Sequence, residues 1–185
     1  MQALIDAPSH RQDFEIVGFV TDQPDAQALD RAATAGIPCA VIALADFADR
    51  AAWNVALSEA ITTYQPDYVV SAGFMRVIAQ PTLNLFHNRI INTHPALLPE
   101  FPGAHAVRDA LSARATETGC TVHLVDEGVD TGPIIRQQAV AIEPTDTEST
   151  LHERIKIVER KMLVETITEI SQHGLHIDGR KVTTA

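Results

Sequence analysis

The chain has 185 residues, of which 45% are hydrophobic and 21% are charged. This length and hydrophobic content fit one folded domain and exclude a wholly disordered chain. The formal net charge of −10 disfavours binding to nucleic-acid phosphates, and no apolar run approaches the roughly 20 residues that a membrane-spanning helix needs. We therefore expect a soluble cytoplasmic protein, with no nucleic acid and no membrane as partner.

Apolar runs and helical patterns alternate through the first half of the chain. Residues 1–7 look like the end of an amphipathic helix. The pattern then predicts strands at residues 14–20, 39–42, 68–70 and 89–91, and helices at residues 25–35, 47–64 and 75–85, the last interrupted by Pro81. Strands that alternate with helices in this way predict a doubly wound, mainly parallel sheet with helices on both faces.

The second half has a different pattern. Residues 120–125 alternate and residues 133–142 form another extended run, which predicts an antiparallel or mixed edge to the sheet. A long helix with one apolar stripe is predicted at residues 147–173, capped by Thr147 or Ser149. Residues 175–182 predict a small strand or hairpin. We find no repeat and no linker, so we expect one α/β domain over residues 1–185.

Two polar clusters follow apolar runs. Asn92 and His94 stand two residues apart after the strand at 89–91, and residues two apart in a strand point to the same side. The second cluster, at residues 126–133, ends the alternating run and contains Asp130. Polar side chains at the end of a buried strand need partners, so we interpret the two clusters as one candidate site.

The residue types suit acyl transfer to an amine. The amide of Asn92 can donate to a carbonyl oxygen that gains negative charge. The imidazole of His94 titrates near neutral pH and can move a proton, and Asp130 can raise its pKa or orient a water. This chemistry requires no metal and no covalent nucleophile, and neither Ser71 nor Cys120 stands in a nucleophile pattern.

Each of these side chains also has a purely structural explanation. Asn92 and Asp130 are natural turn residues, and His94 can simply end a strand before Pro95. The same holds for other polar residues: a surface charge at Arg76, a packed sheet residue at His123, a helix start at His105, and core thiols at Cys39 and Cys120.

Longer motifs help to decide between the chemical and the purely structural explanations of these residues. Residues 71–76 (SAGFMR), 92–103 (NTHPALLPEFPG) and 119–133 (GCTVHLVDEGVDTGP) resemble the phosphoribosylglycinamide formyltransferase family, within the folate-dependent formyltransferase superfamily. The resemblance runs on through residues 151–156 to residues 179–182. It implies a Rossmann-like formyltransferase fold. The activity it implies is formyl transfer from 10-formyltetrahydrofolate, the co-substrate, to the amine of glycinamide ribonucleotide in de novo purine biosynthesis, with no metal.

The resemblance also assigns roles to individual positions. Asn92, His94 and Asp130 match the catalytic residues, with His94 as the proton donor. The folate-binding positions are Arg50, Met75, Arg76, Val77, Ile78, Asn92, Asp126, Glu127, Gly128, Val129 and Asp130. The positions that face the ribonucleotide are Pro95, Lys156, Ile157, Val158 and Glu159, of which Glu159 suits the amino group.

In the family a strand and a Gly/Ser/Asn-rich loop, which holds the substrate phosphate, come before the segment that residues 1–7 resemble. We therefore expect an N-terminally truncated formyltransferase domain with weakened binding of the ribonucleotide phosphate. The alternatives are a formyltetrahydrofolate hydrolase and a non-catalytic folate-binding module. A methionyl-tRNA formyltransferase is disfavoured by the acidic balance, and a homodimer is left open.

Overall fold

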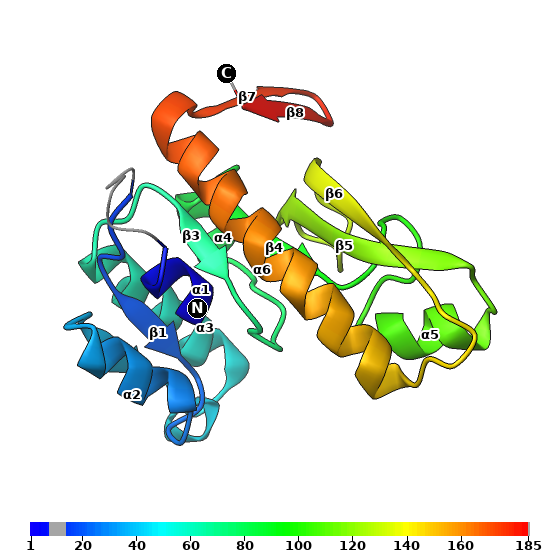
Figure 1. The fold of residues 1–185 in the computed structure, drawn as a ribbon. Helices are drawn as coiled ribbons and strands as arrows, with labels where there is room; N and C mark the ends of the chain where they lie inside the picture. The colour runs from blue at the N-terminus through cyan, green and yellow to red at the C-terminus, as the bar shows by residue number, and fades with distance from the viewer. Residues whose placement is uncertain (8–13, 185) are drawn as a thin grey trace.

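The structure, a computed structural model, describes residues 1–7 and 14–184 (Figure 1). Its helices are α1 Gln2–Ile5, α2 Gln27–Thr34, α3 Arg50–Thr63, α4 Thr82–Leu85, α5 Ala106–Ser112 and α6 Glu148–His173, with a 3-10 turn at Leu44–Asp46. Its strands are β1 Phe19–Thr21, β2 Cys39–Val41, β3 Val69–Ser71, β4 Ile90–His94, β5 Glu117–Leu124, β6 Ile134–Ala141, β7 Leu175–Asp178 and β8 Lys181–Thr184.

The first four strands pair in parallel, in two separate groups. β1 pairs with β2, and β3 pairs with β4, each through three residues. The α/β class predicted from the sequence is confirmed. The predicted strand at residues 14–20 is shorter than expected, since only Phe19–Thr21 pairs with β2. Phe14 and Ile16 instead pack against the hydrophobic core.

The antiparallel edge is also confirmed. β5 pairs antiparallel with both β4 and β6, so that the larger sheet has the order β3-β4-β5-β6. β5 is buried along seven of its eight residues, because it lies in the middle of this sheet. The register with β6 shifts between Val122 and His123, and such a bulge re-aims the side chains that follow it.

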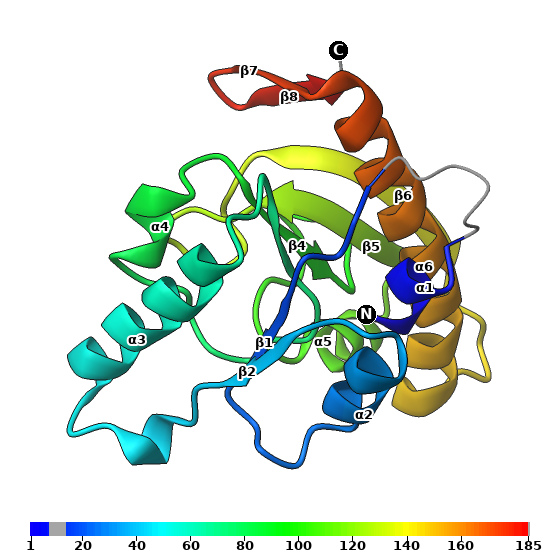
Figure 2. The same ribbon diagram turned by 90° about the vertical axis from the view of Figure 1, so that its left-hand side faces the viewer.

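Helix α6 covers one face of this sheet. Thr147 caps it through a reciprocal pair of hydrogen bonds with Thr150, so Thr147 rather than Ser149 fills the capping role. The buried side of the helix packs with residues of β4 and β5 in one core cluster: Leu151, Ile155, Met162, Leu163, Ile167 and Ile170 from α6, Ile91 from β4, and Cys120, Val122 and Leu124 from β5. Figure 2 shows α6 on one side of the sheet and α3 and α4 on the other.

A second cluster lies on the α3 side of the sheet. Trp53, Leu57 and Ile61 of α3 pack against Ile90 of β4. Neighbouring residues of β4 therefore face different layers: Ile90 faces α3 and Ile91 faces α6. This alternation is the expected two-residue period of a strand between two layers, and it decides on which face the polar residues of β4 lie.

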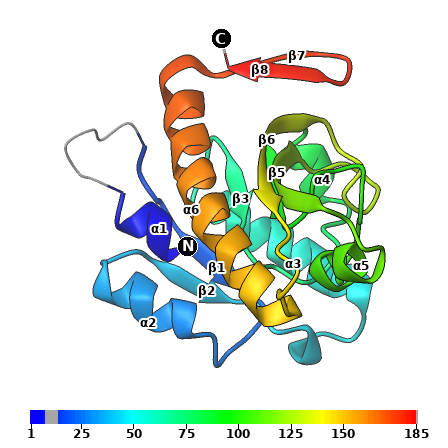
Figure 3. The ribbon, with the colours of Figure 1, turned by 45° about the vertical axis from the view of Figure 1, so that its right-hand side comes forward.

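The ends of the chain pack on α6. The short helix α1 contacts α6, which agrees with the helical pattern at residues 1–7. The predicted tail is a β7–β8 hairpin that follows the last turn of α6 (Figure 3). Arg136 of β6 pairs with Glu169 of α6, whose other neighbour is Thr184 of β8. No helix of the described residues is long and apolar enough to span a bilayer.

The prediction of a helix over residues 75–85 is wrong for most of its length. Only Thr82–Leu85 is helical, after a cis peptide bond between Gln80 and Pro81. Residues 75–80 are irregular because long-range contacts hold them: Ile78 is buried in the cluster on α3, and Arg50 donates a hydrogen bond to the carbonyl of Val77.

The packing of α6 gives a direct stability test. Ile155 is fully buried in the core, whereas Ile157 of the same helix is 67% exposed. We expect Ile155→Ala to lower the free energy of unfolding by about 3 kcal/mol, because it leaves a cavity. Ile157→Ala, the matched control, should change it by less than ~0.5 kcal/mol. Urea denaturation measures both, and equal effects would contradict this packing.

Candidate active site

Strand β4 brings Asn92 and His94 to the same face of the sheet. Both lie within the strand, so it runs further than the predicted end at Ile91. Directly across the antiparallel pair, Asn92 faces His123 and His94 faces Thr121. The face that carries these four side chains is the one opposite to α6, because the intervening Thr93 contacts α6.

His94 has an acceptor at each ring nitrogen. Its Nε2 lies 2.8 Å from the carbonyl oxygen of Phe101, and its Nδ1 lies 3.3 Å from Oδ2 of Asp130. A carbonyl and a carboxylate can only accept from these nitrogens. The surroundings therefore supply a partner for each N–H of a doubly protonated ring, and His94 itself is only 4% exposed.

Asp130 is held in the turn between β5 and β6. Its backbone has a φ of 55°, a left-handed conformation that Asp and Asn tolerate better than most residues. The backbone N–H of Gly103 donates to Oδ2 at 2.8 Å. The same carboxylate oxygen thus meets both the loop after β4 and the ring of His94, and it joins the turn after β5 to the end of β4 and the loop that follows it.

The loop at residues 95–103, which supplies these contacts, is fastened to β5 and β6. Thr121 donates to the carbonyl of Ala96 at 2.6 Å and accepts from the N–H of Leu98 at 3.1 Å. Gln137 of β6 donates to the carbonyl of Leu98 and to the Thr121 hydroxyl. Thr121 is fully buried, so these hydrogen bonds are sheltered from water and rigidly set the path of the loop.

The structure also places His123 beside these residues. The sequence alone does not distinguish it from a histidine that is simply packed within a sheet. Its Nε2 lies 3.2 Å from Nδ2 of Asn92 and 3.7 Å from Oδ1 of Asp130. Burial lowers the pKa of His123, because a charged ring would lose its hydration. Its place opposite Asn92 follows from strand pairing, and the only signal in the sequence is a histidine in an alternating run.

A second group of side chains borders the site from the α3 side. Arg50 lies over the ring of Trp53, 4.3 Å from its centroid, and Phe74 stacks on the same ring at 6.2 Å. Arg50 also donates to the carbonyl of Val77 at 2.6 Å. Arg76 forms an ion pair with the buried Asp22, which follows β1. Residues 74–78 are therefore held by contacts to α3 and to the end of β1.

The predicted folate-binding residues differ in exposure. Met75 and Val77 are 77% and 55% exposed, whereas Ile78 is buried against α3. In the turn after β5, Glu127, Gly128 and Val129 are exposed. Asp126 shapes this turn: its Oδ1 accepts from the N–H of Gly128 and from the Thr131 hydroxyl.

The four predicted residues of α6 approach β4 from the other face. Glu159 accepts a hydrogen bond from the Thr93 hydroxyl at 2.7 Å. Lys156 pairs with Glu153 one turn earlier, Ile157 is exposed, and Val158 packs against the core. The pKa of the Cys120 thiol is raised to about 12, first by burial and then by the nearby Glu159 carboxylate. The buried thiol is therefore un-ionised and unreactive at neutral pH.

Comparisons with known proteins show the family to which the chain belongs. The sequence profile of the formyl transferase family matches residues 1–167. The phosphoribosylglycinamide formyltransferase of Mycobacterium tuberculosis is 45% identical over 183 residues, 99% of this chain and 85% of that protein. The Bacillus subtilis enzyme of the same name is 38% identical over 88% of this chain and 83% of that protein. The crystal structure of glycinamide ribonucleotide transformylase 1 from Symbiobacterium toebii superposes with a TM-score of 0.93 at 40% identity, covering 98% of this chain and 86% of that one.

The chain belongs to the formyl transferase family. The profile spans most of the chain, including both polar clusters, all of β6 and most of α6. The fold expected from the family resemblance is thereby confirmed. In this formyl transferase the contacts described above join His94 to Asp130 and place Asn92 on the same face of β4 as His94, so the two polar clusters lie at one place in the fold.

Three other residues considered from the sequence of this formyl transferase lie outside that cluster. His105 is exposed at the start of α5, Cys39 is exposed on β2, and Pro95 is half-buried in the loop after β4. Within residues 1–7 and 14–184 there is no group of three or more His, Cys, Asp or Glu side chains arranged to hold a metal ion.

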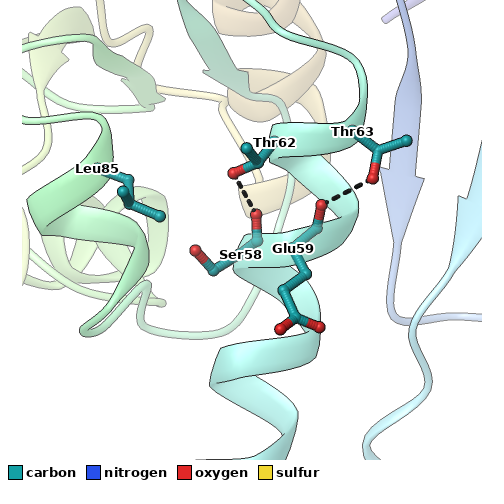
Figure 4. A pocket seen from close by; sticks show the side chains of 5 residues that line it. All are labelled: Ser58, Glu59, Thr62, Thr63 and Leu85. Carbon is teal, nitrogen blue, oxygen red and sulfur yellow. Dashed lines mark hydrogen bonds between the residues drawn. The ribbon is translucent and has the colours of Figure 1, made fainter.

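A shallow hollow of about 320 Å³ lies between α3 and α4. Figure 4 shows the residues that line it: Ser58, Glu59, Thr62, Thr63 and Leu85. The hydroxyls of Thr62 and Thr63 bond back to the carbonyls of their own helix. None of these residues belongs to the Asn92–His94–Asp130 cluster, so the hollow does not form part of the site in this formyl transferase.

Two buried threonines of β5 provide a matched test of the loop anchor. Thr121 and Thr118 are both fully buried, but the Thr118 hydroxyl has no hydrogen-bond partner among the residues that the structure describes. We expect Thr121→Val to lower the free energy of unfolding by about 2–3 kcal/mol, because it leaves the Leu98 N–H and its neighbours unpaired. It should also speed amide exchange at Leu98 and Gly103. Thr118→Val should be neutral or stabilising. Equal losses in urea denaturation would contradict the anchoring role.

Proposed function

We propose that this chain transfers the formyl group of 10-formyltetrahydrofolate to the amine of glycinamide ribonucleotide. The observation that carries the proposal is that Asn92 and His94 lie on one face of β4 and that Asp130, from the turn after β5, reaches the ring of His94 at 3.3 Å. Asp130 also lies 3.7 Å from His123, the residue that contacts Asn92. The identity of 45% to a phosphoribosylglycinamide formyltransferase over 99% of the chain supports the choice of substrates. The reaction belongs to purine biosynthesis.

In this reaction the amine nitrogen bonds to the formyl carbon, and the bond from that carbon to the folate nitrogen breaks. The formyl oxygen gains negative charge while the new bond forms. Asn92 is the donor for that oxygen, since its amide projects from β4 on the face that carries His94. One such donor, held in place before the reaction, is worth about 3–4 kcal/mol of the barrier.

His94 moves the proton. The incoming amine must lose a proton and the folate nitrogen must gain one, so a group that both donates and accepts is required. Asp130 stabilises the protonated ring through its carboxylate, 3.3 Å from Nδ1. Because the Phe101 carbonyl holds Nε2, Nδ1 is the nitrogen from which the proton travels, either directly or through a water beside Asp130.

The folate ring would lie between residues 75–78 and the turn at residues 126–130. These two segments carry three of the exposed large hydrophobic side chains of the described residues: Met75, Val77 and Val129. Exposed apolar groups close to polar ones are typical of a ligand site. Arg50 and Arg76 fix the first segment by its backbone carbonyl and by the ion pair to Asp22, so the exposed side chains stand on a rigid base.

The ribonucleotide would approach from the side of α6 and Pro95. The Glu159 carboxylate can accept hydrogen bonds from the substrate amine, and Thr93 holds one of its oxygens at 2.7 Å. Lys156, partly exposed on the same helix, is the nearby cation suited to an anionic substrate. Ile157 and Val158 complete this stretch of α6.

A three-way assay tests the function. We expect the purified chain to form formylglycinamide ribonucleotide from 10-formyltetrahydrofolate and glycinamide ribonucleotide, measured by the absorbance of the released tetrahydrofolate. Formate release at the same rate without the acceptor would show a formyltetrahydrofolate hydrolase instead. Folate binding without turnover in either assay would show a non-catalytic folate-binding module.

Variants of the cluster test the assigned roles. We expect Asp130→Asn and His94→Ala each to lower kcat by about 10²–10⁴-fold, because the proton can no longer be moved. Folate affinity, measured by titration calorimetry, should change much less. Asp109→Asn, a surface carboxylate of α5 that is 45% exposed, is the control and should keep full activity. Near-normal turnover in either cluster variant would remove that residue from its role.

A further inference from the structure

His123 contacts the site from β5, directly across the strand pair from Asn92. It is 2% exposed, although the bulge in β5 lies just before it. A buried histidine needs a partner at each polar nitrogen. Here the partners are the carbonyl oxygen of Leu124 at Nδ1 and the side-chain amide of Asn92 at Nε2.

These two contacts define which ring nitrogen carries the proton. The Leu124 carbonyl lies 2.8 Å from Nδ1 and can only accept, so Nδ1 bears the hydrogen. In a neutral ring Nε2 is then a lone-pair acceptor. The atom of Asn92 that lies 3.2 Å away is the amide nitrogen Nδ2, a donor. Each ring nitrogen of His123 therefore faces a partner of the opposite kind: the Nδ1–H faces the Leu124 carbonyl, and the Nε2 lone pair faces the Asn92 amide N–H.

The neutral form matters because charged neighbours lie nearby. Asp130 is 3.7 Å from Nε2, and His94 and Asp126 also act on the ring. Burial outweighs the two carboxylates and the Leu124 carbonyl, so the pKa of His123 is lowered. A protonated His123 would compete with His94 for Asp130, and its Nε2–H would repel the N–H of Asn92 instead of accepting it.

We propose that His123 is a positioning residue for formyl transfer: its Nε2 accepts one N–H of Asn92 and thereby turns the other N–H toward the formyl oxygen. The inference rests on the proposed function, because it assigns to Asn92 the task of binding that oxygen. Without the acceptor, the amide of Asn92 can rotate by half a turn and present its own oxygen, which would repel the developing charge.

Two substitutions separate this role from simple packing. His123→Phe keeps a buried ring but removes the acceptor, whereas His123→Gln keeps an acceptor oxygen. We expect the Phe variant to lose about 10²-fold in kcat, the lower end of what one lost donor costs, with little change in the KM for folate. The Gln variant should recover most of that loss.

The decisive comparison uses Asn92→Ala as the background. If His123 acts through Asn92, His123→Phe should lower kcat strongly in the wild-type chain and hardly at all in the Asn92→Ala chain. The reason is that both substitutions remove the same interaction, the one between the Asn92 amide and the formyl oxygen. Equal losses in both backgrounds, or a Gln variant as poor as the Phe variant, would overturn the proposal.

A second readout does not depend on turnover. Nitrogen-15 NMR of the wild-type chain distinguishes a protonated Nδ1 from a protonated Nε2, and we expect His123 to carry its proton on Nδ1. A proton on Nε2 would overturn the inference whatever the kinetics. If the wild-type chain transfers no formyl group, the proposed function fails, and the positioning role in that reaction fails with it. A proton on Nδ1 in that case would show that the failure lies in the reaction and not in the hydrogen bond between His123 and Asn92.

Discussion

The site depends on the antiparallel register between β4 and β5. That register sets Asn92 opposite His123 and His94 opposite Thr121. One residue of each pair belongs to the proposed catalytic cluster and the other contacts its surroundings: Thr121 fastens the loop after β4, and His123 lies 3.2 Å from the Asn92 amide. A slip of one residue would turn the polar face of β4 toward α6 and its apolar core. The tight packing of Ile91, Val122 and Leu124 on α6 is what prevents such a slip.

The two walls of the site are built from different physical forces. On the β5 side, hydrogen bonds dominate: the turn after β5 reaches back through Asp130 to the backbone of Gly103. The buried Gly132 lets this turn close, since a Cβ there would stand 1.7 Å from the carbonyl oxygen of Leu124. On the α3 side, stacking and ion pairing dominate, through Trp53, Phe74 and Arg50. The folate that we propose as ligand would meet one polar wall and one largely apolar wall.

Much of this arrangement could be predicted from local sequence patterns. The alternation of strands and helices, the long helix α6 and the hairpin after it all follow from periodicity and capping residues, and they agree with the structure. The polar cluster at Asn92, His94 and Asp130 could be proposed because the chemistry needs those residue types. The irregular path of residues 75–80 could not be predicted, because contacts from Arg50 and the α3 cluster override a locally helical pattern. The task of His123 depends on which residue stands across the sheet, and no local pattern contains that information.

Trp53 is the only tryptophan in the chain. Its indole is fully buried, donates to the carbonyl of Ile42, and contacts both the Arg50 guanidinium and the Phe74 ring. Arg50 in turn holds the Val77 carbonyl of the segment that borders the site. The emission of a single indole in such surroundings responds to small movements of the cation and ring beside it. The fluorescence of Trp53 can therefore report movements of the segment at residues 74–78, on the α3 side of the site, without any attached dye.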